Sequence, residues 1–177
     1  MEDDLFRPLM TREEALLLSR EYNYGNDLEL ERAGDAIRNG DYARRHFDAI
    51  FKWKTRNRGK SRPQKNSDAE IAEALRIVVA VKSPRLAIST LCGLVGVAIP
   101  VASAIMTSIR PSEYTIIDFR ALEALDQDAD QVWSLAYYER YLSFCRALAA
   151  EWGMSLRDLD KALWMWSKKN GDVEVVP

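Results

Sequence analysis

Two features of the sequence could do chemistry, and the first is a turn. Residues 94–102 read Leu-Val-Gly-Val-Ala-Ile-Pro-Val-Ala and predict two short helices that meet at a tight turn. Gly96 can adopt a positive φ there, and Val97 can fill the core beneath it. The second helix then begins with amide groups that point outward. Such amides form a phosphate site that reads no base sequence.

The second feature is Asp118, in the segment Ile116-Ile117-Asp118-Phe119-Arg120. Its position predicts the N-cap of a helix over residues 119–125. The helix dipole would keep the carboxylate charged, facing away from the apolar Ile116 and Ile117. A plain capping role is the alternative to a chemical one.

A basic segment covers residues 52–65 and contains no acidic residue. A local patch of this kind suits contacts with phosphates and a steep salt dependence of binding. The alternative is a solvated loop that contributes only solubility. Trp53 and Lys54 could face a cleft, although Trp53 could equally be core beneath the loop. The positive residues predicted to bind DNA are Lys52, Lys54, Arg56, Arg58, Lys60 and Arg62, and Lys65 ends the segment.

The aromatic residues are candidates for a base-binding pocket. Trp133, Tyr137, Tyr141 and Phe144 share one stripe of a long predicted helix, which is typical of core. Tyr138 falls off that stripe, so we expect it in a pocket or at the surface. Trp164 and Trp166 cannot both face the core of one helix, and one could stack on a ligand. Trp53, Tyr138 and Trp164 are therefore the predicted pocket residues.

Residues that start and stop helices recur along the whole chain, and no segment shows the alternation of apolar and polar residues that is typical of a strand. Helices must therefore position these side chains. The predicted class is all-α, with about nine helices. Residues 86–109 contain no charged residue, and hydropathy alone favours a membrane span. Gly93, Gly96 and Pro100 lie close together there and favour two buried helices with a turn. The predicted helices begin near residues 11, 27, 41, 67, 84, 99, 118, 128 and 155.

Composition narrows the function classes. The 177 residues carry a net charge of −2, so a contact with a polyanion must come from a local patch. His46 is the single histidine, and Cys92 and Cys145 have no metal-ligand spacing. We therefore expect no metal, no iron–sulfur cluster and no other cofactor. The reduced cysteines and an acidic N-terminus without an apolar run favour a cytoplasmic protein.

The turn and the aspartate resemble those of the helix-hairpin-helix DNA glycosylases, the superfamily of endonuclease III, MutY and the 8-oxoguanine glycosylases. The family hairpin reads L-P-G-V-G-x-K-T-A, and this chain has L-V-G-V-A-I-P-V-A in register. The family's catalytic aspartate follows at a matching distance, at Asp118. A bacterial branch of the superfamily also shares Trp53-Lys54-x-x-x-Arg58 and Arg157-x-x-Asp160-x-x-Leu163-Trp164.

The resemblance implies a two-lobed helical fold in one domain over residues 1–169. The hairpin would lie at about 84–109, the catalytic segment at 116–125 and a flexible tail at 170–177. The implied function is hydrolytic removal of a modified or damaged base that is flipped out of double-stranded DNA. The implied protein acts as a monomer and has no membrane partner. Asp118 would stabilise a ribosyl oxocarbenium ion and activate water. Gly96 and Ala98 would contact phosphates.

Three departures from the family pattern bear on the chemistry. Ala98 replaces the second hairpin glycine, and the usual histidine after the aspartate is not matched. Pro100 stands where bifunctional members have their nucleophilic lysine, so the resemblance implies a monofunctional enzyme. The alternatives are a catalytically inactive DNA-binding module, and a helical interaction protein with no nucleic-acid role.

Overall fold

The computed structural model describes residues 6–23, 27–128 and 133–171. Within these residues the secondary structure is entirely helical, with nine α-helices and one short 3-10 helix, which confirms the predicted class. The elements are α1 (Arg12–Glu21), α2 (Asp27–Arg38), α3 (Arg44–Thr55), η1 (Pro63–Lys65), α4 (Asp68–Ala80), α5 (Pro84–Cys92), α6 (Ile99–Ile109), α7 (Phe119–Glu123), α8 (Leu135–Trp152) and α9 (Leu156–Asn170).

Side-chain caps start most of these helices where the sequence predicts. Thr11 and Glu14 form a capping box at α1, and Ser67 and Glu70 form another at α4. The Ser83 hydroxyl caps α5, in which Pro84 takes the first helical position. Local hydrogen bonding therefore determines these boundaries.

Two predicted starts are wrong. The long helix α8 begins at Leu135 rather than near residue 128, because the Ser134 hydroxyl accepts the Tyr137 amide and caps it there. Helix α3 begins after Ala43, and the Asp41 carboxylate accepts the Ala43 amide outside the helix. Of the predicted tail, Asn170 is the last residue of α9, and residues 172–177 lie outside the described part.

The uncharged stretch forms two helices. Helices α5 and α6 are joined by a turn in which Gly96 has φ +85°, as the sequence predicts. Val97 is buried beneath the turn, and α6 is buried along most of its length. Among the described residues, no helix combines the length and the apolar character that crossing a membrane requires.

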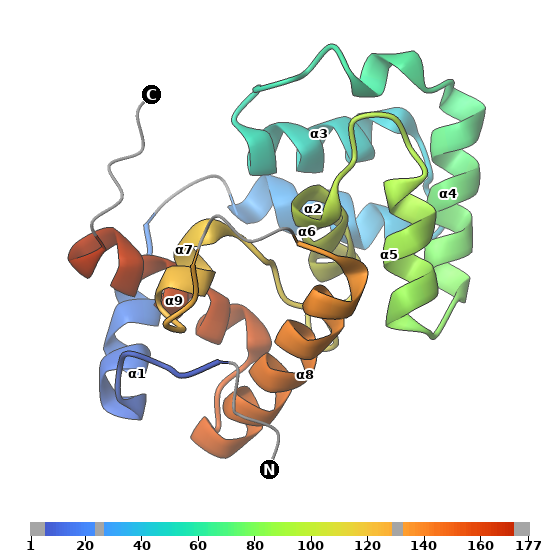
Figure 1. Cartoon of the computed structure of the whole chain (residues 1–177). Helices are drawn as coiled ribbons and strands as arrows, with labels where there is room; N and C mark the ends of the chain where they lie inside the picture. The colour runs from blue at the N-terminus through green and yellow to red at the C-terminus, as the bar shows by residue number, and fades with distance from the viewer. Residues whose placement is uncertain (1–5, 24–26, 129–132, 172–177) are drawn as a thin grey trace.

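The helices pack in two groups (Figure 1). Helices α2 to α6 contact one another at one end of the molecule, and α1, α7 and α8 each pack on α9 at the other. Contacts between α5 and α8 join the groups, and the buried side chains of both belong to one hydrophobic core. The groups also meet where α3 ends, opposite α7 and α9, and the candidate site lies there.

Candidate functional site

An open pocket of about 530 Å³, including the solvent at its mouth, brings together residues from distant parts of the sequence. Helix α3 and the residue after it supply one wall. The segment before α7 supplies another, and α9 with the residue after α1 supplies the rest. The lining residues are Tyr22, Trp53, Lys54, Arg56, Ile116, Asp118, Arg157, Asp160 and Trp164.

Asp118 is held by two hydrogen bonds. Its Oδ1 accepts the backbone amide of Ala121 at 3.0 Å, which is the predicted N-cap of α7. Its Oδ2 accepts from the Nζ of Lys54 at 3.0 Å. The two side chains are only 19% and 11% exposed, so the ion pair is largely shielded from water. Capping and ion pairing therefore fix the carboxylate in the pocket wall.

The backbone that leads to Asp118 is anchored by neighbouring helices. The Tyr138 hydroxyl donates to the Thr115 carbonyl at 3.0 Å, and the Tyr141 hydroxyl donates to the Ile116 carbonyl at 2.9 Å. On the other side, the Ile117 amide donates to the Ser103 hydroxyl of α6 at 3.2 Å. Asp118 is thus positioned by α6, α8 and its own helix.

This arrangement corrects one pocket prediction. Tyr138 is fully buried in the core and does not line the pocket. The rings of Tyr138 and Tyr141 are both buried, because segment 114–117 packs across α8 and covers a second face of that helix. The predicted single core stripe was therefore too narrow. Trp53 and Trp164 do line the pocket.

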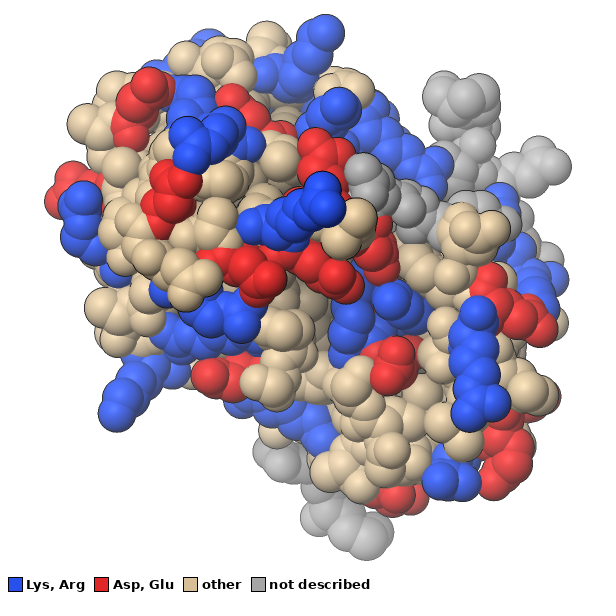
Figure 2. All heavy atoms as spheres, turned by 180° about the vertical axis from the view of Figure 1, so that it is seen from behind, with Lys and Arg blue, Asp and Glu red and all other residues tan. Residues whose placement is uncertain are grey.

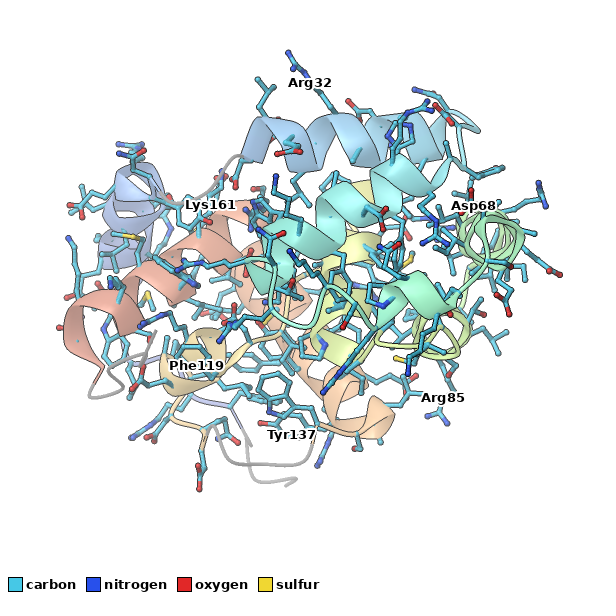
Figure 3. The ribbon with its side chains drawn as sticks, turned by 90° about the horizontal axis from the view of Figure 1, so that it is seen from above. Arg32, Asp68, Arg85, Phe119, Tyr137 and Lys161 are labelled. Carbon is cyan, nitrogen blue, oxygen red and sulfur yellow. The ribbon has the colours of Figure 1, made fainter. Side chains whose placement is uncertain are left out.

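Helix α9 supplies three pocket residues at positions i, i+3 and i+7, which places Arg157, Asp160 and Trp164 on one face. Arg157 forms an ion pair with Asp160 and a second with Asp27 at the start of α2, at 2.9 Å. Lys161 also reaches Asp27, at 3.2 Å, and Figure 3 shows Lys161 on the side of α9 toward α2 and α3. These ion pairs join the two helix groups at the pocket.

Asp160 lies in a different environment from Asp118. Burial, together with the nearby Asp118 charge, raises the pKa of Asp160 to about 6, although Arg157 and Lys54 oppose the shift. Its side chain is 7% exposed. The pocket therefore holds two carboxylates, and burial favours the protonated form of Asp160.

Aromatic rings line the pocket and are largely covered by cations. The Arg157 guanidinium lies over the rings of Trp53 and Tyr22, at 5.4 and 5.6 Å from their centroids. Tyr22 meets Trp164 edge to face at 5.6 Å, and Arg120 lies over Trp164 at 5.3 Å. The buried indole N–H of Trp53 makes no hydrogen bond to any described residue.

Sequence reasoning missed Tyr22, Arg157 and Asp160 as site residues. Arg157 and Asp160 were expected only as part of a motif shared with a bacterial branch of the family, although their i, i+3 spacing also predicts a polar face of a helix. Tyr22 follows α1 and carried no local signal, because its position depends on the packing of α1 against α9.

The structure divides the basic segment. Lys54 and Arg56 line the pocket, whereas the other positive side chains are exposed outside it. Arg56 ends α3 in the left-handed region, with φ +51°, which turns the chain away from the helix. Figure 2 shows basic and acidic side chains interspersed over one face of the molecule, in keeping with the small net charge. The exposed residues of the segment are Lys52, Arg58, Lys60, Arg62 and Lys65.

The hairpin is bound to the end of this basic segment. The Asn66 side chain accepts the Val95 amide at 2.8 Å and donates to the Val95 carbonyl at 3.0 Å. A Cβ added to Gly96 would lie 2.7 Å from the Arg62 Cβ, so the turn requires glycine for close approach as well as for its φ. Gly96 and Ala98 remain exposed, and a phosphate-binding role for them remains a prediction.

No group of three or more histidine, cysteine, aspartate or glutamate side chains that could hold a metal ion occurs in the described part of the chain. Cys145 is buried and Cys92 half-buried, and both are free thiols.

Comparisons of the chain with protein-family models, with curated proteins and with solved structures gave no match. The helix-hairpin-helix resemblance therefore remains a prediction that rests on the residues themselves.

Proposed function

We propose that the chain is a DNA N-glycosylase that hydrolyses the bond between deoxyribose and a modified or damaged base flipped into the pocket. The observation that carries the proposal is the fixed carboxylate of Asp118 in the wall of a pocket that also contains aromatic rings. A carboxylate beside a sugar carbon stabilises the cation that forms as the base departs.

The pocket residues have distinct roles in this proposal. Asp118 faces the sugar and directs water to C1′ as the glycosidic bond breaks. Trp53 and Trp164 contact the flipped base, which stacks on the Arg157 guanidinium or displaces it from the rings. The exposed arginines and lysines of residues 52–65 and the hairpin amides bind the phosphates of the duplex.

A second candidate is a DNA-binding module that has lost catalysis. The observation that favours it is that both Asp118 oxygens already accept hydrogen bonds, one from Ala121 and one from Lys54. A neutralised carboxylate stabilises a sugar cation less well than a free one.

The experiment measures base release and duplex binding for the same proteins. Asp118→Asn is the informative variant, because asparagine caps a helix as well as aspartate but carries no charge. Asp35→Asn makes the same chemical change at an exposed position on α2 and is the control. Duplexes carrying a range of modified bases are incubated with each protein, and the free base is identified by mass spectrometry.

We expect wild type and Asp35→Asn to release the same base, and Asp118→Asn to be slower by about a hundredfold or more. Equal rates for wild type and Asp118→Asn would reject Asp118 as the catalytic group. Salt-dependent duplex binding without release of any base would favour the binding module.

A further inference from the structure

We propose that the pocket selects modified bases that carry a negative charge, such as a base with an added carboxylate, and discriminates against cationic bases. The inference rests on the proposed function and deepens it, because it names the class of base that the glycosylase takes from DNA. Its basis is the way in which cations of the chain already occupy the pocket walls.

All three aromatic rings that line the pocket have a cation of the chain over them. The Arg157 guanidinium lies 5.4 Å from the centroid of the Trp53 ring and 5.6 Å from that of Tyr22. The Arg120 guanidinium lies 5.3 Å from the centroid of Trp164. The attraction of these rings for positive charge is therefore already satisfied, and a cationic base that stacked on them would meet like charges.

The two carboxylates of the pocket wall are each paired with a cation. Asp118 pairs with the Nζ of Lys54 at 3.0 Å, and Asp160 pairs with Arg157. Burial also raises the pKa of Asp160 to about 6, which favours its neutral form. Neither carboxylate therefore presents an unbalanced negative charge to a ligand.

Two positive charges at the pocket are not balanced in this way. Arg56 lines the pocket as an exposed residue directly after α3, and Arg120 is only 6% exposed and donates to the neutral Ser167 hydroxyl at 3.2 Å. Neither forms an ion pair within the described part of the chain. A cleft with an excess of one sign of charge attracts ligands of the other sign, and a guanidinium can bind a carboxylate through two parallel hydrogen bonds.

An NMR titration with nucleosides tests the inference, because a nucleoside contains the base and the sugar but no phosphate. The compound 5-carboxy-2′-deoxyuridine carries a negative charge on its base, and 2′-deoxyuridine is its uncharged counterpart. The compound 1-methyl-2′-deoxyadenosine carries a cationic base, and 2′-deoxyadenosine is its uncharged counterpart. The indole N–H signals of Trp53 and Trp164 report binding in the pocket, and that of the buried Trp152, which does not line the pocket, is the internal reference.

Two variants separate the pocket charge from the overall charge of the protein. Arg56→Gln removes an unbalanced cation from the pocket and keeps a side chain that forms hydrogen bonds. Arg32→Gln makes the same change at an exposed position on α2, where Figure 3 shows the side chain pointing away from the molecule, and is the matched control. Circular dichroism melting checks that each variant is folded.

We expect wild type and Arg32→Gln to bind the acidic nucleoside about tenfold more tightly than 2′-deoxyuridine, or better. Arg56→Gln should lose about fivefold in affinity for the acidic nucleoside and none for the uncharged one. The cationic nucleoside should bind more weakly than its uncharged counterpart.

The inference is overturned if wild type binds the acidic nucleoside no more tightly than 2′-deoxyuridine, or if millimolar acidic nucleoside shifts neither pocket indole signal. It is equally overturned if the cationic nucleoside binds more tightly than 2′-deoxyadenosine, or if Arg56→Gln keeps the whole preference for the acidic nucleoside.

Nucleoside binding requires no bond cleavage, so this result is separate from the base-release assay. A preference for the acidic nucleoside without base release from any duplex would keep the charge selectivity and reject the glycosylase. Release of cationic bases faster than acidic ones would keep the glycosylase and reject the charge selectivity.

Discussion

The ion pair between Lys54 and Asp118 can be tested through its contribution to stability. Asp118→Asn removes the negative charge but preserves the cap on α7, and Lys54→Met removes the positive charge but keeps an apolar stem. Each single variant leaves the partner charge uncompensated in a shielded site. The double variant leaves neither charge, so it should be more stable than the sum of the two single losses predicts.

The expected coupling follows from the geometry. At 3.0 Å the Coulomb attraction is on the order of 5 kcal/mol when the effective dielectric constant is about 20. Desolvation of two side chains that are 11% and 19% exposed offsets part of this attraction. We therefore expect a coupling free energy of about 2 kcal/mol.

Urea denaturation of the four proteins measures the coupling, provided that all four unfold with the same m-value. The pair formed by Arg85 and Glu139 supplies a control cycle, because it has two hydrogen bonds but lies at the surface, with 62% of the arginine side chain exposed. We expect its coupling to be the smaller of the two, since water screens exposed pairs. Additive losses at Lys54 and Asp118, or a coupling no larger than the control, would refute the shielded ion pair.

Two further predictions concern the packing and the titration of the fold. Gly34→Ala should lower the free energy of unfolding by about 1–3 kcal/mol, because the added Cβ would lie 2.0 Å from the Ser108 carbonyl oxygen of α6. Urea denaturation measures the change. A gain of about 1 kcal/mol, which helix propensity alone predicts, would contradict the close crossing of α2 and α6. Asp160 binds its proton more tightly in the folded state, with its pKa raised to about 6 from 3.8, so its stabilising contribution is complete below pH 3.8 and is lost as the pH rises through 6. The free energy of unfolding of wild type minus that of Asp160→Asn should therefore fall by about 3 kcal/mol between those limits, and a difference that is flat or rises with pH would exclude the shift.

Local signals in the sequence predicted much of the fold. The capping boxes at Thr11 and Ser67, the N-cap at Asp118 and the turn at Gly96 all depend on hydrogen bonds or dihedral angles within a few residues. Where such a signal was overridden, as at Asp41, a neighbouring contact decided the boundary: its carboxylate pairs with His46 and accepts the Ala43 amide. The starts at Thr11, Ser67 and Asp118 were therefore predictable, whereas the cap at Ser134 was missed.

The site was predictable only where one residue carried both a local and a functional signal. Asp118, Trp53 and Trp164 were expected in the pocket and line it. Tyr138 was misplaced because helical periodicity reports one buried face, whereas the segment before α7 covers a second face of α8. The contact between Tyr138 and Thr115 joins residues far apart in the sequence, so the periodicity of one helix cannot predict it.

The contact between Lys54 and Asp118 shows why the chemistry is harder to predict than the fold. Lys54 belongs to a run of positive residues whose density indicates phosphate binding, and its place beside Trp53 suggested a cleft but not the Asp118 carboxylate as its partner. The contact arises because the last turn of α3 faces α7, while the rest of the segment continues to the hairpin, where Asn66 binds Val95. A related chain could therefore keep the hairpin and the aspartate and still lose this ion pair, if position 54 changed. In such a chain, the carboxylate would keep its cap on α7 but lack the charged partner opposite it.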